Sequence, residues 1–307
     1  MPSNHPRLPY TWPQAIEWPT LLLLVACLGG WVIALFWVAP VSLFGAGLIV
    51  TFTLVLHSSL THEVLHGHPF PNRWASEALV LINPGLFIPY LRFRDQHLAH
   101  HQDSRLTDPY DDPETNYVDP MVWNRLPRAW RSVLRMNNTL AGRMVVGPLV
   151  GQFMFMKNDL CEALKLDAQV IKGWALHVPG VILVLWVVLQ SETPVWLYLV
   201  SAYAALSILK IRTFLEHQAH ELARGRTVIV EDRGILALLF LNNNLHVVHH
   251  MHPRVPWYRL PALYAANKGR YLRRNEGYLY HGYREVFARH FLRSKDPVPH
   301  PLWPSAE

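Results

Sequence analysis

Three histidine clusters are the residues in this sequence whose types and spacing could do chemistry. They are His62-x-x-x-His66, His97-x-x-His100-His101 and His246-x-x-His249-His250. Residues three and four apart lie on one face of a helix, so the imidazoles of each cluster can converge on one point. Imidazole is the commonest metal ligand among side chains. Because the clusters contain eight of the 18 histidines, they predict a metal centre.

The number of imidazoles bears on how many ions they hold. Eight exceed what one octahedral ion accepts, so we predict two metal ions. A ninth ligand is expected at His217, and His220 is the alternative. Neither cysteine, Cys27 or Cys161, lies in a cluster. A shell of imidazoles suits iron, copper or zinc, and the residues alone leave these three metals open.

Polar residues beside the clusters are candidates to orient the ligands. A metal-bound imidazole usually donates its other ring N–H to a carboxylate, a carbonyl or a comparable acceptor. We predict this supporting role for a set of residues close to the clusters, namely Glu63, Asp103, Asp108, Glu216, Asn242 and His220. No catalytic side chain is expected beyond the metal centre itself.

Long apolar segments must position the clusters. The chain is 51% hydrophobic and only 16% charged, and it contains 12 tryptophans. About 20 apolar residues in a helix cross the ~30 Å hydrocarbon core of a membrane. Four such spans are predicted, at residues 20–40, 41–61, 173–190 and 194–211. Because a second apolar run follows the first directly, a membrane span is favoured over a cleaved signal peptide.

The distribution of basic residues predicts the orientation. The two outer connections, near residues 39–40 and 190–194, contain no Lys or Arg, so all 28 basic residues fall on the other side. The positive-inside rule makes that side cytoplasmic. We therefore expect an all-α integral membrane protein, a single domain over residues 1–307. Its spans form two hairpins, and a cytoplasmic helical cap at 62–172 and 212–307 carries the clusters, with both termini cytoplasmic. The net charge of +6 then indicates no nucleic-acid partner.

The three clusters, with a membrane hairpin before the first and the third, resemble the membrane fatty acid desaturase superfamily. The segment from Arg212 to His217 and the Asn-Asn-Asn-Leu-His run are similar to those of bacterial fatty acid desaturases. The resemblance extends from about residue 20 to about residue 264. It implies a bacterial inner-membrane location and a non-haem di-iron centre that uses O₂. The iron ligands that it implies are His62, His66, His97, His100, His101, His217, His246, His249 and His250.

The resemblance also implies the reaction. We expect an O₂-dependent enzyme that introduces a double bond into a fatty acyl chain or lipid. The superfamily includes hydroxylases and ketolases, so oxidation of a lipid or another apolar substrate on the same centre is the close alternative. A histidine-rich membrane metal transporter is the remote one. It would require polar residues within the spans, and three of the four spans are nearly bare of them.

Two further partners are expected. The sequence has no G-x-G-x-x-G motif, cysteine cluster or haem-attachment motif, so the electrons must come from an external donor of the ferredoxin, rubredoxin or cytochrome type. The basic run at residues 268–274 could dock that donor by charge complementarity, and contact with anionic lipid is an equal alternative. Arg92, Arg94 and Lys157 are candidates to hold an anionic substrate head group.

Overall fold

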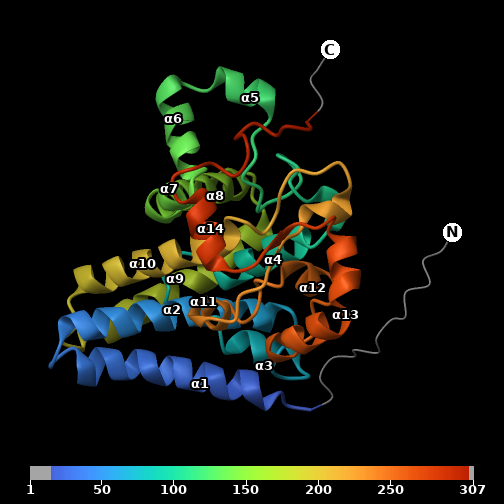
Figure 1. Ribbon diagram of the computed structural model, residues 1–307. Coiled ribbons are helices and arrows are strands. Elements are labelled where there is room, and N and C mark those ends of the chain that lie inside the picture. Colours follow the sequence, from blue (N-terminus) through green and yellow to red (C-terminus); the bar gives the residue numbers. More distant parts are fainter. Residues whose placement is uncertain (1–14, 304–307) are drawn as a thin grey trace.

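The structure, a computed structural model, describes residues 15–303 and is almost entirely helical (Figure 1). Its helices are α1 Trp18–Ile33, α2 Leu43–Leu65, α3 Arg73–Ala78, α4 Tyr90–His100, α5 Pro120–Arg125, α6 Arg128–Asn137, α7 Leu140–Val145, α8 Gly147–Leu164, α9 Ala168–Leu189, α10 Val195–Thr213, α11 Ile235–Leu239, α12 His246–Met251, α13 Leu260–Arg274 and α14 Tyr283–His290. Two short strands, β1 Ile229–Val230 and β2 Leu279–Tyr280, pair in parallel.

Four of the helices are long and apolar enough to cross a membrane, as the sequence predicts. These candidate spans are Trp18–Val38, Leu43–Leu65, Ala168–Leu189 and Val195–Thr213. The third begins earlier than expected, because the Asp167 carboxylate caps it by accepting from the backbone N–H groups of Gln169 and Val170. The second continues past residue 61 to Leu65. The first histidine cluster therefore lies on the last turn of α2.

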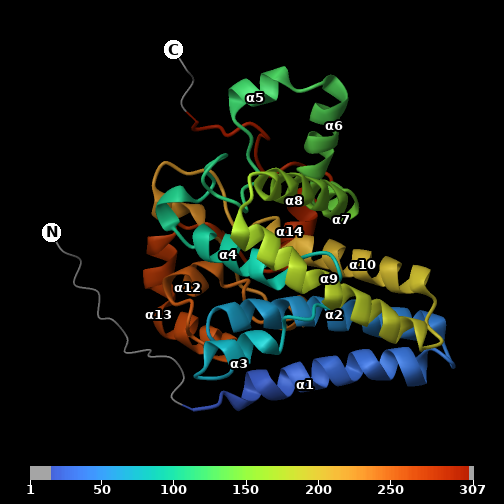
Figure 2. The same ribbon diagram turned by 180° about the vertical axis from the view of Figure 1, so that it is seen from behind.

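Helix α2 is the centre of the bundle and packs on both α1 and α10 (Figures 1 and 2). Gly47 permits the close approach of α10, because a Cβ there would lie 3.1 Å from a methyl carbon of Leu197. Small residues commonly allow such contacts between membrane helices. The Thr51 hydroxyl donates to the Gly47 carbonyl within α2. This close packing fixes the position of the histidine-bearing end of α2 relative to the end of α10 that precedes His217.

A buried tyrosine joins three parts of the bundle. The Tyr198 hydroxyl of α10 donates to the Pro84 carbonyl at 2.7 Å and accepts from the Trp31 indole N–H at 3.0 Å. Pro84 belongs to the non-helical segment between α3 and α4. His177 of α9 donates to the Leu86 carbonyl of the same segment at 2.8 Å. The segment is thus held among the spans, directly before the helix that carries the second histidine cluster.

The remaining residues, 66–167 and 214–303, form a region that we call the head. Helices α4, α12 and α13 gather at one end of the four spans (Figures 1 and 2). Arg92 of α4 holds this helix against α9 and α8. Its side chain lies on Gly173 of α9, and its guanidinium binds the Asp159 carboxylate of α8. Helix α12 packs on α13 and β1. The second and third histidine clusters are thereby brought to the inner end of α2.

Replacing Tyr198 with Phe should destabilise the bundle. The substitution leaves the Pro84 carbonyl and the Trp31 N–H without their partner in a buried setting, which typically costs about 1–3 kcal/mol. Thermal unfolding of the purified protein in detergent measures this. The exposed Tyr110, replaced in the same way, is the matched control. Equal midpoints for the two variants would contradict the role that we assign to Tyr198.

Candidate metal centre

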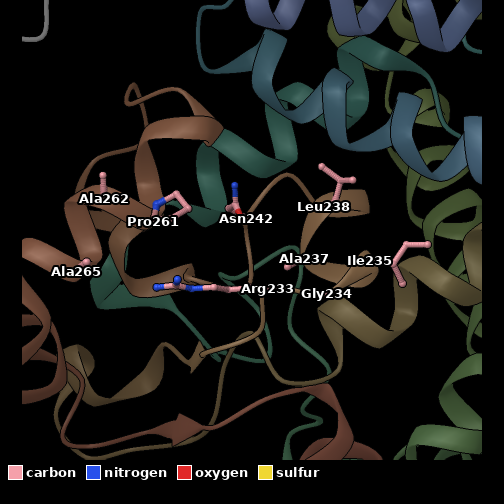
Figure 3. Close-up of a pocket in the computed structure, with 9 residues that line it drawn as sticks. All are labelled: Arg233, Gly234, Ile235, Ala237, Leu238, Asn242, Pro261, Ala262 and Ala265. Carbon is pink, nitrogen blue, oxygen red and sulfur yellow. The ribbon is translucent and has the colours of Figure 1, made fainter.

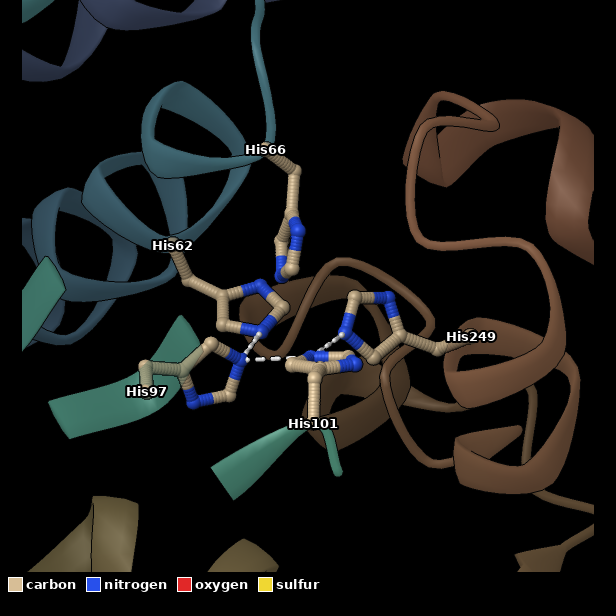
Figure 4. A group of neighbouring side chains, drawn as sticks. All are labelled: His62, His66, His97, His101 and His249. Carbon is tan, nitrogen blue, oxygen red and sulfur yellow. Dashed lines mark hydrogen bonds between the residues drawn. The ribbon is translucent and has the colours of Figure 1, made fainter. Parts of the chain in front are cut away.

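Nine histidines lie in two adjacent groups where the spans meet the head. The ligand nitrogens within each group are all within 4.8 Å of one another. The first group contains His62, His66, His97, His101 and His249 (Figure 4). The second contains His100, His217, His246 and His250. The structure thus brings together every residue that the sequence suggests as a metal ligand, and it leaves His220 outside both groups.

The first group joins α2, α4 and α12. Nε2 of His97 lies 3.0 Å from Nε2 of His62 and 2.9 Å from Nε2 of His101. Nε2 of His249 lies 3.2 Å from Nε2 of His101. His66, just beyond the end of α2, directs its ring to the same space (Figure 4). His62 and His66 are four residues apart, as are His97 and His101, so the rings of each pair can point to one side of the helix.

The second group is built around His217, which follows the end of α10. Its Nε2 lies 2.8 Å from Nε2 of His100 and 3.2 Å from Nε2 of His246. The H-x-x-H-H clusters therefore divide between the groups. From the second cluster, His97 and His101 belong to the first group and His100 belongs to the second. The third cluster divides the other way, since His249 belongs to the first group and His246 and His250 belong to the second. The stacked rings of His101 and His250, 4.3 Å apart, connect the two groups.

Three of the imidazoles are oriented by acceptors on their other ring nitrogen. Each Nδ1 donates a hydrogen bond, and the pairs are His97 to Glu114 at 2.9 Å, His100 to Asp112 at 2.7 Å and His246 to Asn243 at 3.0 Å. A neutral imidazole with its proton on Nδ1 has a lone pair on Nε2. The acceptors therefore fix the tautomer in which Nε2 can bind a metal.

This donor set fits metal ions better than it fits hydrogen bonds among the histidines. Nε2 of His217 faces Nε2 of both His100 and His246, and a single ring nitrogen either donates one proton or accepts one, so one of these two contacts is left unpaired. Nε2 of His66 is buried without a hydrogen bond. Buried polar atoms are normally satisfied, and exceptions mark functional sites. A cation shared by each group would satisfy these nitrogens.

Burial and mutual repulsion keep most of these rings neutral. Loss of hydration lowers the pKa of His66, His246 and His249 well below 6.5, and the neighbouring histidines lower it further. His100 differs. Burial lowers its pKa, but Glu114 and Asp112 outweigh that effect and raise it to about 9. Since a metal binds neutral imidazole, these carboxylates would hold the Nδ1 proton of His100 while Nε2 binds the ion.

Two of the expected supporting carboxylates lie next to ligands, beyond hydrogen-bond distance. An oxygen of Glu63 is 3.8 Å from Nδ1 of His62, and an oxygen of Glu216 is 3.8 Å from Nδ1 of His246. Glu216 instead pairs with Arg212 at 3.0 Å. The Arg212 cation keeps the carboxylate beside the second group, within a buried environment.

The other expected supporting residues have different contacts. Asp108 accepts from the backbone N–H groups of Tyr110 and Asp111, Asn242 donates to the Trp257 carbonyl, and His220 contacts Leu222. The side chain of Asp103 lies outside the described part of the chain.

The observed acceptors Asp112 and Glu114 belong to the acidic run at residues 108–114, which begins with Asp108. Asn243 is the middle residue of the Asn triplet at 242–244. The left-handed backbone of Thr107, with φ of 70°, turns the acidic run back toward α4. The Asp112 carboxylate holds that turn by accepting from the Thr107 N–H at 2.9 Å.

The three head-group candidates differ in their surroundings. Arg92 binds Asp159 through two hydrogen bonds of 3.0 Å, and Arg94 pairs with Glu77 and Asp95. Lys157 is exposed. Its side chain is the one of the three that has no ion pair within the described residues.

A narrow cavity lies between α2, α10 and the segment before α4. It is lined mainly by apolar side chains, among them Leu54, Phe87, Ala205 and Leu209. Thr61, which also lines it, directly precedes His62, and the ring of Phe93 lies 5.7 Å from that of His97. Its volume of about 70 Å³ is below the ~300–1,000 Å³ of typical ligand pockets. The cavity is therefore a small apolar space beside the first histidine group.

Comparison with known proteins supports the resemblance seen in the sequence. The family model described as fatty acid desaturase matches residues 41–283, well over half of the chain. The chain belongs to the fatty acid desaturase family. With its four apolar helices, this family membership indicates an integral membrane oxidoreductase.

A beta-carotene ketolase from Paracoccus sp. (strain N81106 / MBIC 01143) is 22% identical over 227 residues, covering 70% of this chain and 74% of the relative. The family and this relative together indicate a lipid-modifying oxygenase.

Metal-free protein should lose stability as the pH falls from 6.5 to 5.5. The lowered pKa values of His66, His246 and His249 mean that the unfolded chain binds protons that the folded chain does not. We expect a loss of up to about 1.4 kcal/mol per pH unit for each histidine. Thermal unfolding after chelation, at pH 7.5, 6.5 and 5.5, measures it.

Two other ionisable groups, Glu114 and His100, do not account for a loss of stability between pH 6.5 and 5.5. The pKa of Glu114 is held well below its usual 4.5, against the effect of burial, by His100 and His97, so its contribution is lost only at lower pH. The raised pKa of His100 contributes stability that is fully present below 6.5 and is lost toward pH 9. An unfolding midpoint that stays level or rises on acidification would contradict the assignment of neutral, buried imidazoles.

Proposed function

We propose that the two histidine groups hold two iron ions and that the protein uses O₂ to introduce a double bond into a fatty acyl chain or lipid. The observation that carries this proposal is the convergence of nine imidazoles in two adjacent groups beside an apolar cavity. Bound iron would supply the oxidising power that side chains lack. An imidazole shell alone also suits copper or zinc, and family membership favours iron.

The protein's own residues position the reactants. Glu114, Asp112 and Asn243 hold their histidines in one tautomer and orientation. Leu54, at one wall of the cavity, is almost fully buried, as is Ala205 at the other. An apolar chain between these walls would lie against the first histidine group. Apolar walls also exclude water from the reacting carbon, which suppresses side reactions.

A second candidate is conversion of a methylene group to a carbonyl on an apolar substrate, or its hydroxylation. The observation that favours it is the similarity to a beta-carotene ketolase. The same centre serves both candidates, because each begins at an unactivated C–H bond. They differ in whether a second hydrogen is removed from the neighbouring carbon or oxygen is transferred to the first.

Electron supply and orientation complete the proposal. The electrons would come from an external ferredoxin, rubredoxin or cytochrome-type donor. Residues 268–274 on α13 offer a basic surface for it, with Arg270 and Arg273 exposed. Lys268 is partly neutralised by Glu231 at 2.5 Å. We place the head on the cytoplasmic side of a bacterial inner membrane, where the positive-inside rule puts the basic residues.

Product analysis tests the proposed reaction. Cells that express the chain should contain lipids whose acyl chains have lost two hydrogens, and His249→Ala should abolish this change because it removes a ligand of the first group. The exposed His281 lies outside both groups, so His281→Ala is the matched control. Mass spectrometry of total lipid gives the readout.

A parallel culture that makes β-carotene distinguishes the two candidates. If β-carotene gains a carbonyl group in that culture and the acyl lipids are unchanged, the function is ketone formation and not desaturation. If neither lipid class differs between the wild type and His249→Ala, the proposed function is wrong.

Filling the cavity should impair turnover without releasing metal. Ala205→Phe places a ring where the substrate chain would lie, and we expect a loss of roughly tenfold or more in rate. Ala204→Phe makes the same volume change on α10 at a position that does not line the cavity. Rates and metal content are measured on both purified variants. Equal rates for the two would show that the cavity does not hold the substrate.

A further inference from the structure

A second, larger hollow lies between α11 and the start of α13 (Figure 3). It is an open groove of about 740 Å³, within the range of ligand-binding pockets. Most of its walls are apolar, formed by Ile235, Ala237, Leu238, Pro261, Ala262 and Ala265. None of these residues lines the cavity between α2 and α10, so the groove is separate from the proposed reaction site.

The groove lies at the level where the membrane meets the head. The Ser59 hydroxyl, inside the second span, donates to the Leu239 carbonyl at the end of α11 at 2.7 Å. Figure 1 shows α11 against α2. On the other wall, the Trp257 indole just before α13 donates to Thr20, near the inner end of the first span, at 3.2 Å. Both walls of the groove are therefore tied to membrane-spanning helices.

Helix α11 presents apolar side chains outward. Ile235 is 68% exposed and Leu238 is 57% exposed. Large exposed apolar side chains on a helix that packs against a membrane span are suited to contact acyl chains. Ile235 and Leu238 also line the groove, so its apolar wall is continuous with this exposed surface.

One cation stands at the groove. Arg233 is exposed, and it has no ion pair within the described residues. In Figure 3 its side chain extends from the start of α11 toward Pro261 and Ala265. The adjacent Asp232 does not pair with it, because its carboxylate accepts from the backbone N–H groups of Gly234 and Tyr283. The guanidinium is therefore available to a ligand.

We infer that this groove binds an anionic phospholipid of the leaflet on the head side. Its phosphate would accept hydrogen bonds from Arg233, and the first part of an acyl chain would lie against Leu238 and Ala262. A guanidinium binds phosphate through two parallel hydrogen bonds, and anionic lipids concentrate basic side chains at the membrane surface. Free phosphate would leave the apolar walls unused. A zwitterionic lipid has a cation beside its phosphate, so it would gain less from the charge of Arg233 than an anionic lipid does.

Lipid retention tests this inference. The full-length wild type and Arg233→Gln are reconstituted in nanodiscs of phosphatidylcholine with a minor fraction of phosphatidylglycerol, and native mass spectrometry counts the lipids that stay bound. We expect the wild type to retain phosphatidylglycerol selectively and Arg233→Gln to reduce that retention about fivefold, the effect of one arginine near a lipid surface. Arg293→Gln, which removes another exposed positive charge elsewhere in the head, should retain it as the wild type does.

A second variant tests the apolar wall. Ala262→Trp fills the groove and should reduce retention of phosphatidylglycerol while Arg233 is intact. Metal content, measured on the same samples, should not change, because the groove lies outside both histidine groups. This readout does not depend on the reaction catalysed, so it can fail or succeed independently of the proposed function.

Three results would overturn the inference. The first is wild-type retention of phosphatidylglycerol in Arg233→Gln, and the second is equal loss in Arg233→Gln and Arg293→Gln, which would indicate a diffuse charge effect. The third is retention of added oleate in place of phosphatidylglycerol, which would assign the groove to a free fatty acid.

Discussion

The structure is organised around one electrostatic constraint, which is that buried ring nitrogens converge with too few hydrogen-bond donors between them. Nε2 of His217 lies within 3.2 Å of two other Nε2 atoms whose rings have their protons on Nδ1. The single Nε2 of His217 cannot pair with both of its neighbours, so one contact lacks a hydrogen bond. Burial lowers the pKa of His217 and His246 and keeps them neutral, whereas Glu114 and Asp112 raise the pKa of His100. The rest of the chain serves to maintain this arrangement.

The spans and the head share that work. Close packing at Gly47 and the hydrogen bonds of Tyr198 fix α2, α10 and the segment before α4 relative to one another. The acidic run then turns at Thr107, so that Asp112 and Glu114 reach the far nitrogens of α4 histidines. A membrane bundle thereby sets the positions of the ligands, and carboxylates of the head set their tautomers. The adjacent cavity is lined by α2 and α10 together with α4 and the segment before it, so the bundle and the head both shape it.

Much of this could be predicted from the sequence, because the strongest signals are local. Uninterrupted apolar runs predict the four spans. The spacing of three and four residues predicts that each cluster converges on one point, whereas the two H-x-x-H-H clusters each divide between the two groups. Helical geometry also explains why His97 and His101 face one group while His100 faces the other. The predicted membrane span ends at residue 61, and the helix itself continues into the first histidine cluster and ends at Leu65, where its last residues are buried.

The supporting residues were harder to predict, because they depend on loop geometry. Asp108 and Asp112 are equally plausible from the sequence, and only the left-handed turn at Thr107 directs Asp112 to His100. In the Asn triplet, the left-handed backbone of Asn242 leaves Asn243 to accept from His246. Propensity scarcely signals such backbone conformations in residues other than glycine. The same limit applies to the groove at Arg233, which forms only when α11 and α13 pack at the membrane boundary.

The most direct test of the central claim is the iron content of the purified full-length protein, combined with X-ray absorption at the iron edge. We expect two iron ions per chain, one for each histidine group, each bound mainly by nitrogen. A folded protein with all nine histidines that binds a single ion, or that binds iron through sulfur, would contradict it.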